Sequence, residues 1–224
     1  MTSPYDDLAR SIDHALLSPA LTERELDDGC RLALELGVAS VCVVPHFLGR
    51  CAEILRGSPV KATTTIGFPH GVHTTAVKLA EAERALADGG EELDVVVNVG
   101  RVRSGDFGYV RAELAALTRA VHSEGRKIKV IFENAYLNSA QKITLCHISN
   151  ELGVDWAKTS TGFGPSGATL EDVVLMRAHC RPEVQIKASG GIRDATFALA
   201  LRRAGATRIG TSSTRAILES LRAA

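Results

Sequence analysis

Short apolar runs alternate with amphipathic segments along the whole chain. The runs are rich in valine, isoleucine and threonine, which favour strands, and they recur about every 22–34 residues, a suitable spacing for βα units. Eight strands are expected, over residues 11–17, 39–44, 61–67, 92–99, 127–133, 154–160, 184–189 and 207–210.

The segments that follow these strands have helical periodicity. Thr22 and Glu25 have the spacing of a capping box, and Gly37 stands where a C-cap glycine belongs. Between them, apolar residues such as Leu26 and Cys30 fall on one helical face. Further helices are expected over residues 74–88 and around 110–121, 145–152, 169–181, 194–204 and 217–221.

The repeated strand–helix pattern predicts the fold class. Largely apolar strands suit a parallel sheet whose outer face is covered by helices. Eight such units without a linker predict an α/β protein in which residues 1–224 form a single (β/α)8 TIM-barrel domain. An open doubly wound sheet is the alternative. Polar residues recur late in many of the strands, as a site at one mouth of a barrel requires, and this favours the barrel.

Composition narrows the classes of partner and location. The 26 basic and 26 acidic side chains balance, which argues against a nucleic acid or a membrane surface bound through bulk charge. The five cysteines form no disulfide framework or zinc-ribbon spacing, and the N-terminus shows no secretory signal, so a reducing, cytoplasmic location is expected. His70 and His73 are too sparse for a zinc site, and no metal is expected.

Two lysines near strand ends carry the strongest chemical signal. Lys158 and Lys187 lie late in the sixth and seventh expected strands, which would be neighbours in a barrel whose active site occupies that end. Two ammonium groups in one pocket repel each other, so one is driven toward the neutral amine, which attacks carbonyl groups and forms a Schiff base. The alternative is that either lysine reaches past the barrel mouth into water.

Asp94 is the third candidate, with Asp13 as a weaker fourth. Alternation in "ELDVVVN" places Asp94 and Val96 on one face and Leu93 and Val95 on the other, so the apolar set would face the helices and Asp94 the barrel interior. A carboxylate there needs a cationic partner. Either it transfers protons beside the lysines, or it forms a purely structural ion pair.

Three glycine-containing loops are suited to an anion. "SGGIR" at 189–193 and "GTSS" at 210–213 follow the last two strands, where barrels of this kind commonly bind phosphate. Glycines let backbone N–H groups approach an anion, and the last helix begins beside them. "STGFG" at 160–164 adds a third loop. By contrast, Cys42 is expected to be a core thiol and Lys78 a solvated residue at a helix start.

Together these stretches resemble a known family. The motifs "IGFPHG", "ELDVVVN", "KVIFE", "AKTSTGFG", "KASGGIRD" and "GATRIGTSS" resemble those of the deoxyribose-phosphate aldolases, class I aldolases that use no metal, over nearly the whole chain. The resemblance implies that Lys158 forms the Schiff base, that Lys187 lowers its pKa, that Asp94 is the acid/base partner and that Asp13 supports the proton relay. It also implies substrate or phosphate binding by Thr161, Gly162, Gly190, Gly191, Ser212 and Ser213.

The implied reaction is the reversible cleavage of 2-deoxy-D-ribose 5-phosphate to acetaldehyde and D-glyceraldehyde 3-phosphate, without a cofactor. The implied partners are therefore a small phosphorylated sugar and acetaldehyde, and a homodimer is the assembly considered. Many family members have lysine in place of Ser18, asparagine in place of Val44 and glutamate in place of Ala76, so acceptor preference can differ.

Three other functions are compatible with parts of this pattern. Another lysine aldolase, such as a transaldolase-like enzyme, would prefer a ketone donor. A catalytically silent sugar-phosphate sensor would keep the pocket without turnover. A phosphosugar isomerase would use carboxylates or a metal and would not need Lys158.

Overall fold

The strands close into a parallel barrel in the order of the sequence. The structure is a computed structural model that describes residues 4–222. Each strand pairs in parallel with the next, and the eighth pairs with the first. The strands are β1 (Ile12–Leu16), β2 (Ser40–Val43), β3 (Lys61–Ile66), β4 (Glu92–Val96), β5 (Lys127–Ile131), β6 (Trp156–Lys158), β7 (Gln185–Ser189) and β8 (Arg208–Thr211). The predicted α/β barrel class and all eight strands are thus confirmed.

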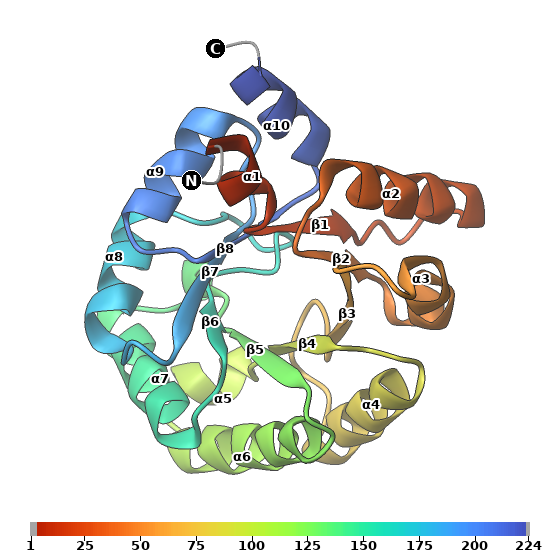
Figure 1. The fold of residues 1–224 in the computed structure, drawn as a ribbon. Coiled ribbons are helices and arrows are strands. Elements are labelled where there is room, and N and C mark those ends of the chain that lie inside the picture. The colour runs from red at the N-terminus through yellow and green to blue at the C-terminus, as the bar shows by residue number, and fades with distance from the viewer. Residues whose placement is uncertain (1–3, 223–224) are drawn as a thin grey trace.

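Helices surround this ring (Figure 1). They are α1 (Pro4–Ala9), α2 (Glu23–Leu36), α3 (Leu48–Leu55), α4 (Thr75–Ala87), α5 (Val99–Arg103), α6 (Phe107–Ser123), α7 (Ser139–Leu152), α8 (Leu170–His179), α9 (Ala195–Arg203) and α10 (Thr214–Arg222), with 3-10 turns η1 (Pro45–Phe47) and η2 (Asn134–Tyr136). None of the helices within residues 4–222 has both the length and the apolar character that crossing a bilayer requires.

Local signals fix the helix ends where the sequence predicts them. Thr22 and Glu25 form the capping box of α2, and Gly37 ends this helix in the left-handed region at φ 65°. Asp194 caps α9 by accepting a hydrogen bond from the backbone N–H of Phe197 at 2.8 Å. These caps fix where each helix starts after its strand, and hence the length of the loops that surround the barrel mouth.

The apolar core fills the space between the strands and the helices. In β4, Leu93 and Val95 belong to this core, together with helix residues such as Leu114 and Leu117 of α6. The opposite face of β4 carries Asp94, which points into the barrel as the alternation predicts. The outer core thus leaves the barrel interior available for polar and charged side chains.

Candidate active site

Two lysines meet one carboxylate inside the barrel. Lys158 ends β6 and lies opposite Lys187 of β7 in the strand register. The Nζ atoms of both lysines lie 2.7 Å from the same oxygen, Oδ2 of Asp94 on β4. The three side chains are buried. The structure therefore brings together the three residues on which the sequence analysis depends, and neither lysine reaches past the mouth into water.

The two lysines differ in their electrostatic surroundings. Burial lowers the pKa of Lys158, and the charge of Lys187 lowers it further, against the opposing effect of Asp94. Burial also acts to lower the pKa of Lys187, but the carboxylates of Asp13 and Asp94 outweigh it and raise that pKa. Lys158 is consequently the amine that loses its proton more readily. The neighbouring charge contributes as expected, but burial is the larger cause.

Asp94 and Asp13 are both fully buried and ionised. Burial acts to raise the pKa of Asp94, but Lys129, Lys158 and Lys187 together hold it well below its usual range. Asp13 on β1 accepts a hydrogen bond from Lys187 Nζ at 2.5 Å, and its pKa is likewise held low. Asp13 and Asp94 thus bind Lys187 from two sides and keep it charged.

Three further charged residues of this cluster were not predicted. Lys129 of β5 donates to Asp94 Oδ1 at 2.9 Å and lies 2.5 Å from Glu92 Oε2. Arg208 of β8 donates to Asp13 Oδ1 at 2.6 Å and contacts Glu92 at 3.1 Å. A signal was present in the sequence, because the alternation that turns Asp94 inward turns Glu92 inward as well.

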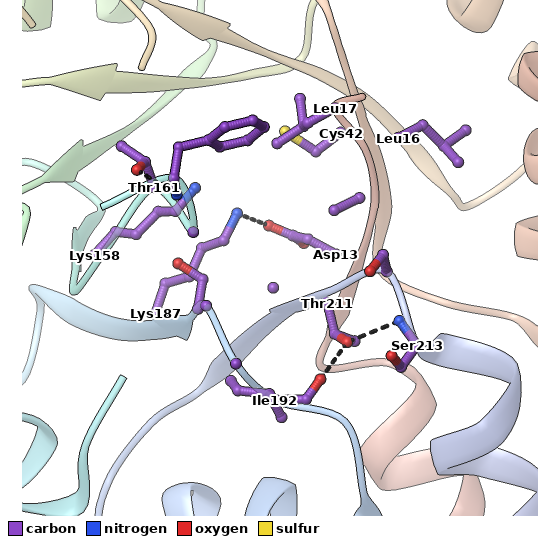
Figure 2. A pocket seen from close by; sticks show the side chains of 18 of the residues that line it. Asp13, Leu16, Leu17, Cys42, Lys158, Thr161, Lys187, Ile192, Thr211 and Ser213 are labelled. Atoms are coloured by element: carbon purple, nitrogen blue, oxygen red, sulfur yellow. Dashed lines mark hydrogen bonds and ion pairs between the residues drawn. The ribbon is translucent and has the colours of Figure 1, made fainter. Parts of the chain in front are cut away.

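A cavity of about 420 Å³ opens above the lysines. Lys158, Lys187 and Asp13 lie at one end of it, and the loops after β1, β6, β7 and β8 form its walls (Figure 2). All six predicted binding residues line this cavity, namely Thr161, Gly162, Gly190, Gly191, Ser212 and Ser213. Ser18 also lines it, whereas Val44 lies outside its lining.

The loops after β7 and β8 are joined at the cavity wall. Thr211 Oγ1 donates to the carbonyl of Ile192 at 2.7 Å and accepts from the backbone N–H of Ser213 at 2.9 Å (Figure 2). Helix α10 begins at the next residue, Thr214, so its N-terminus is directed toward these loops. This arrangement concentrates backbone and hydroxyl donors on one side of the cavity, as an anion requires.

Glycine is needed where these loops approach each other. Gly190 has φ +88°, and a Cβ there would lie 2.9 Å from Gly167 Cα and 3.3 Å from Gly162 Cα. Gly191 has φ +75° and open space around its Cβ position. The Thr161 hydroxyl is already bound to the carboxylate of Glu133. Thr161 therefore holds the loop after β6 in place, and its side chain is engaged within the protein.

Lys78 corrects one expectation. It was predicted to be solvated at a helix start, but its side chain is fully buried. Its Nζ donates to Glu113 Oε2 and to the carbonyl of Val96, both at 2.8 Å. The expectation failed because the partner lies on α6, far along the sequence, and leaves no local signal.

Cys42 and the two histidines add no reactive group to the site. Cys42 lines the cavity but is buried, and burial raises the pKa of its thiol, as expected of a core thiol. Within residues 4–222, His70 and His73 belong to no group of three or more His, Cys, Asp or Glu side chains that could hold a metal ion.

Comparison with known proteins identifies the family. The sequence profile described as "DeoC/LacD family aldolase" matches residues 8–220. The chain belongs to this aldolase family. A deoxyribose-phosphate aldolase from Rhodopirellula baltica is 55% identical to it over 214 residues, which cover 96% of this chain and 89% of the relative.

Solved structures of similar proteins have the same fold as this aldolase. A putative deoxyribose-phosphate aldolase from Coccidioides immitis superposes with a TM-score of 0.94 at 36% identity, covering 99% of this chain and 88% of that one. A deoxyribose-phosphate aldolase from Aeropyrum pernix, described as tetrameric, superposes with a TM-score of 0.91 at 33% identity, covering 97% and 92% of the two chains.

Proposed function

We propose that this aldolase reversibly cleaves 2-deoxy-D-ribose 5-phosphate to acetaldehyde and D-glyceraldehyde 3-phosphate through a Schiff base on Lys158. One observation carries the proposal. Lys158 is buried at the end of a cavity with a lowered pKa, beside a carboxylate and a second lysine that remain charged. The names of the relatives support the choice of substrate.

The first step is attack of the neutral Lys158 amine on the C1 aldehyde of the open-chain sugar. The amine lone pair forms the C–N bond, and loss of water leaves a protonated imine. This iminium withdraws electrons from the C2–C3 bond. Burial of Lys158 favours the reaction because it maintains the amine in the form that can attack.

Cleavage and release then require proton transfers. Removal of the C3 hydroxyl proton lets the C2–C3 bond break, which gives glyceraldehyde phosphate and an enamine on Lys158. Protonation of the enamine at C2 restores an iminium, and water releases acetaldehyde. Asp94 and Lys187 lie beside the Lys158 nitrogen and are proposed to relay these protons through water, with Asp13 supporting Lys187.

The phosphate is proposed to bind at the opposite side of the cavity from Lys158. Backbone N–H groups of Gly190 and Gly191, the Ser212 and Ser213 region and the N-terminus of α10 can provide donors there. An anchored phosphate would hold the acceptor aldehyde at a fixed distance from the enamine, which reduces the entropic part of the barrier.

The proposal extends to cofactor, assembly and location. The imine nitrogen supplies the electron sink, so the reaction needs no metal or organic cofactor. Self-association is also proposed, with a homodimer as the smallest assembly; the relative from A. pernix is described as tetrameric, and light scattering of this protein measures its own state. Five free, buried cysteines support the proposed cytoplasmic location.

One experiment separates this proposal from its rivals. The protein is incubated with acetaldehyde, reduced with borohydride and digested, and the adduct is mapped by mass spectrometry. We expect attachment at Lys158, loss of adduct and activity in Lys158→Ala, and no effect of a chelator. An isomerase would give no reducible adduct, a silent sensor would bind the sugar phosphate without turnover, and a transaldolase-like enzyme would prefer a ketone donor.

A further inference from the structure

A deeper layer of three charged residues, namely Glu92, Lys129 and Arg208, contacts the proposed catalytic side chains and lies outside the lining of the cavity. Glu92 and Arg208 are the first residues of β4 and β8, and Lys129 pairs in register with Asp94. The first residues of the strands lie at the end of a parallel barrel opposite the cavity, and Lys129 lies two residues before the end of β5. The layer thus sits deeper in the barrel than Lys158, which lines the cavity.

Short contacts connect this layer to the carboxylates above it. Lys129 is fully buried, and its Nζ lies 2.9 Å from Asp94 and 3.6 Å from Asp13. Glu92 lies between Lys129, at 2.5 Å, and Arg208, at 3.1 Å. The same arginine binds Asp13 at 2.6 Å. Each carboxylate in the barrel therefore contacts at least one cation of the deeper layer.

Trp156 covers one side of the cations. The Arg208 guanidinium lies 4.6 Å from the centroid of its ring, and Lys129 Nζ lies 5.7 Å from it. An aromatic face attracts cations and at the same time excludes water from them. The deeper layer is consequently shielded, and the charges in it interact more strongly than they would in water.

Counting the charges singles out Lys158. Among the described residues, the strands contribute to these contacts Asp13 from β1, Glu92 and Asp94 from β4, Lys129 from β5, Lys158 from β6, Lys187 from β7 and Arg208 from β8. Cys42 of β2 adds a neutral thiol. Three carboxylates thus face four basic groups, and the cluster is neutral only when one basic group is uncharged.

We propose that Glu92, Lys129 and Arg208 are positioning residues that set the charge state of Lys158. Lys129 and Arg208 partly neutralise the negative charges of Asp94 and Asp13. Lys158, the basic group that faces the cavity, is therefore left without a full counter-charge. Glu92 limits this effect by sharing its charge with both cations. The inference rests on the proposed function, because it assigns a cause to the neutrality that the Schiff base requires.

Opposite substitutions should move the charge state in opposite directions. Lys129→Met removes one positive charge from the cluster. The carboxylates are then balanced only when Lys158 is protonated, so Lys158 holds its proton to higher pH. Glu92→Gln removes an anion, so Lys158 loses its proton at lower pH. One buried charge at this range shifts the apparent pKa by about one to two units. The double variant removes one charge of each sign and should return to the profile of the unaltered protein.

The experiment measures the initial rate of adduct formation on Lys158 between pH 5 and pH 10. Acetaldehyde and cyanoborohydride are used as probes, and the adduct is quantified by mass spectrometry of the purified, full-length protein. We expect the pH at which the rate of adduct formation rises to be higher by about one unit or more in Lys129→Met and lower in Glu92→Gln. In the double variant this pH should return to that of the unaltered protein.

Controls keep the outcomes distinct. Lys129→Arg preserves the charge and should keep the profile, which a general packing effect would not. If Lys129→Met does not fold, Glu92→Gln alone tests the inference, because an unchanged pH dependence of adduct formation in that variant overturns it. A double variant that behaves like Lys129→Met overturns it as well. Failure of the unaltered protein to form any adduct at Lys158 would instead refute the proposed function.

Discussion

The two adjacent glycines after β7 give a sharp test of the proposed phosphate site in the cavity. Both Gly190 and Gly191 have positive φ, so alanine at either position incurs about 1–2 kcal/mol of backbone strain. Only at Gly190 would the added methyl group also meet backbone, 2.9 Å from Gly167 Cα and 3.3 Å from Gly162 Cα. Overpacking of this kind adds about 1–3 kcal/mol.

The two variants should therefore separate stability from binding. Gly190→Ala should lower the free energy of unfolding by about 2–5 kcal/mol and the Tm by roughly 5–20 °C, whereas Gly191→Ala should lower the Tm by only about 2–8 °C. The methyl group that Gly191→Ala adds would meet no atom within 4 Å, on a residue that lines the cavity. We expect it to raise KM for 2-deoxyribose 5-phosphate roughly tenfold, or about 1.4 kcal/mol, with little change for unphosphorylated 2-deoxyribose.

Differential scanning calorimetry and steady-state kinetics with both sugars provide the measurements. Equal losses of Tm in the two variants would contradict the close approach of the loops after β6 and β7. Equal increases of KM for the two sugars in Gly191→Ala would show that this loop does not bind the phosphate. The unphosphorylated sugar serves as the internal control, because it uses the same Schiff base without the anion.

Three other substitutions test the charged groups. Lys187→Met removes a positive charge whose Nζ shares Asp94 Oδ2 with the Lys158 amine, each at 2.7 Å. Two charges about 5 Å apart interact by about 3 kcal/mol at a dielectric near 20, so the pH at which adduct forms should rise by roughly two units. Lys61→Met, at a partly buried pair with Glu91, is the control that should show no shift. Lys78→Met leaves Glu113 buried without its cation and should lower the free energy of unfolding by about 3–5 kcal/mol, measured with denaturant. Adding Glu113→Gln to this variant should restore most of the lost stability. Lys158→Met should abolish activity yet raise the Tm at pH 7, and an unchanged or lower Tm there would contradict the electrostatic reasoning.

Sequence periodicity was enough to find the barrel and its three central residues. The alternation of β4 turned Asp94 inward, and the equivalent depths of Lys158 and Lys187 placed them together, because consecutive strands of a parallel barrel are neighbours. These predictions depend only on the order of the strands and on which face of a strand a residue occupies. Both properties are encoded locally.

Apart from Glu92, which the alternation of β4 turns inward, the missed features depend on information that the sequence does not carry locally. Lys129 faces Asp94 only once the register between β4 and β5 is known. Lys78 is buried because Glu113 of α6 lies beside it, and nothing near either residue indicates the other. The short helices α1 and α5, of six and five residues, contain too few turns to establish a hydrophobic period.

The charges that hold the site together and the amine proposed to react have opposite effects on stability. The lowered pKa of Asp94 stabilises the fold above its unfolded pKa of about 4, and the raised pKa of Lys187 stabilises it below about 10.4; both contributions are present at neutral pH. The lowered pKa of Lys158 acts in the other direction, because the unfolded chain keeps that proton up to about pH 10.4. Folding at pH 7 must release or confine the proton, a penalty that disappears only as the pH approaches the unfolded value. The Lys158 amine is kept neutral at a cost to stability, and the surrounding ion pairs supply the stability that offsets this cost. A nucleophilic amine inside a barrel requires both.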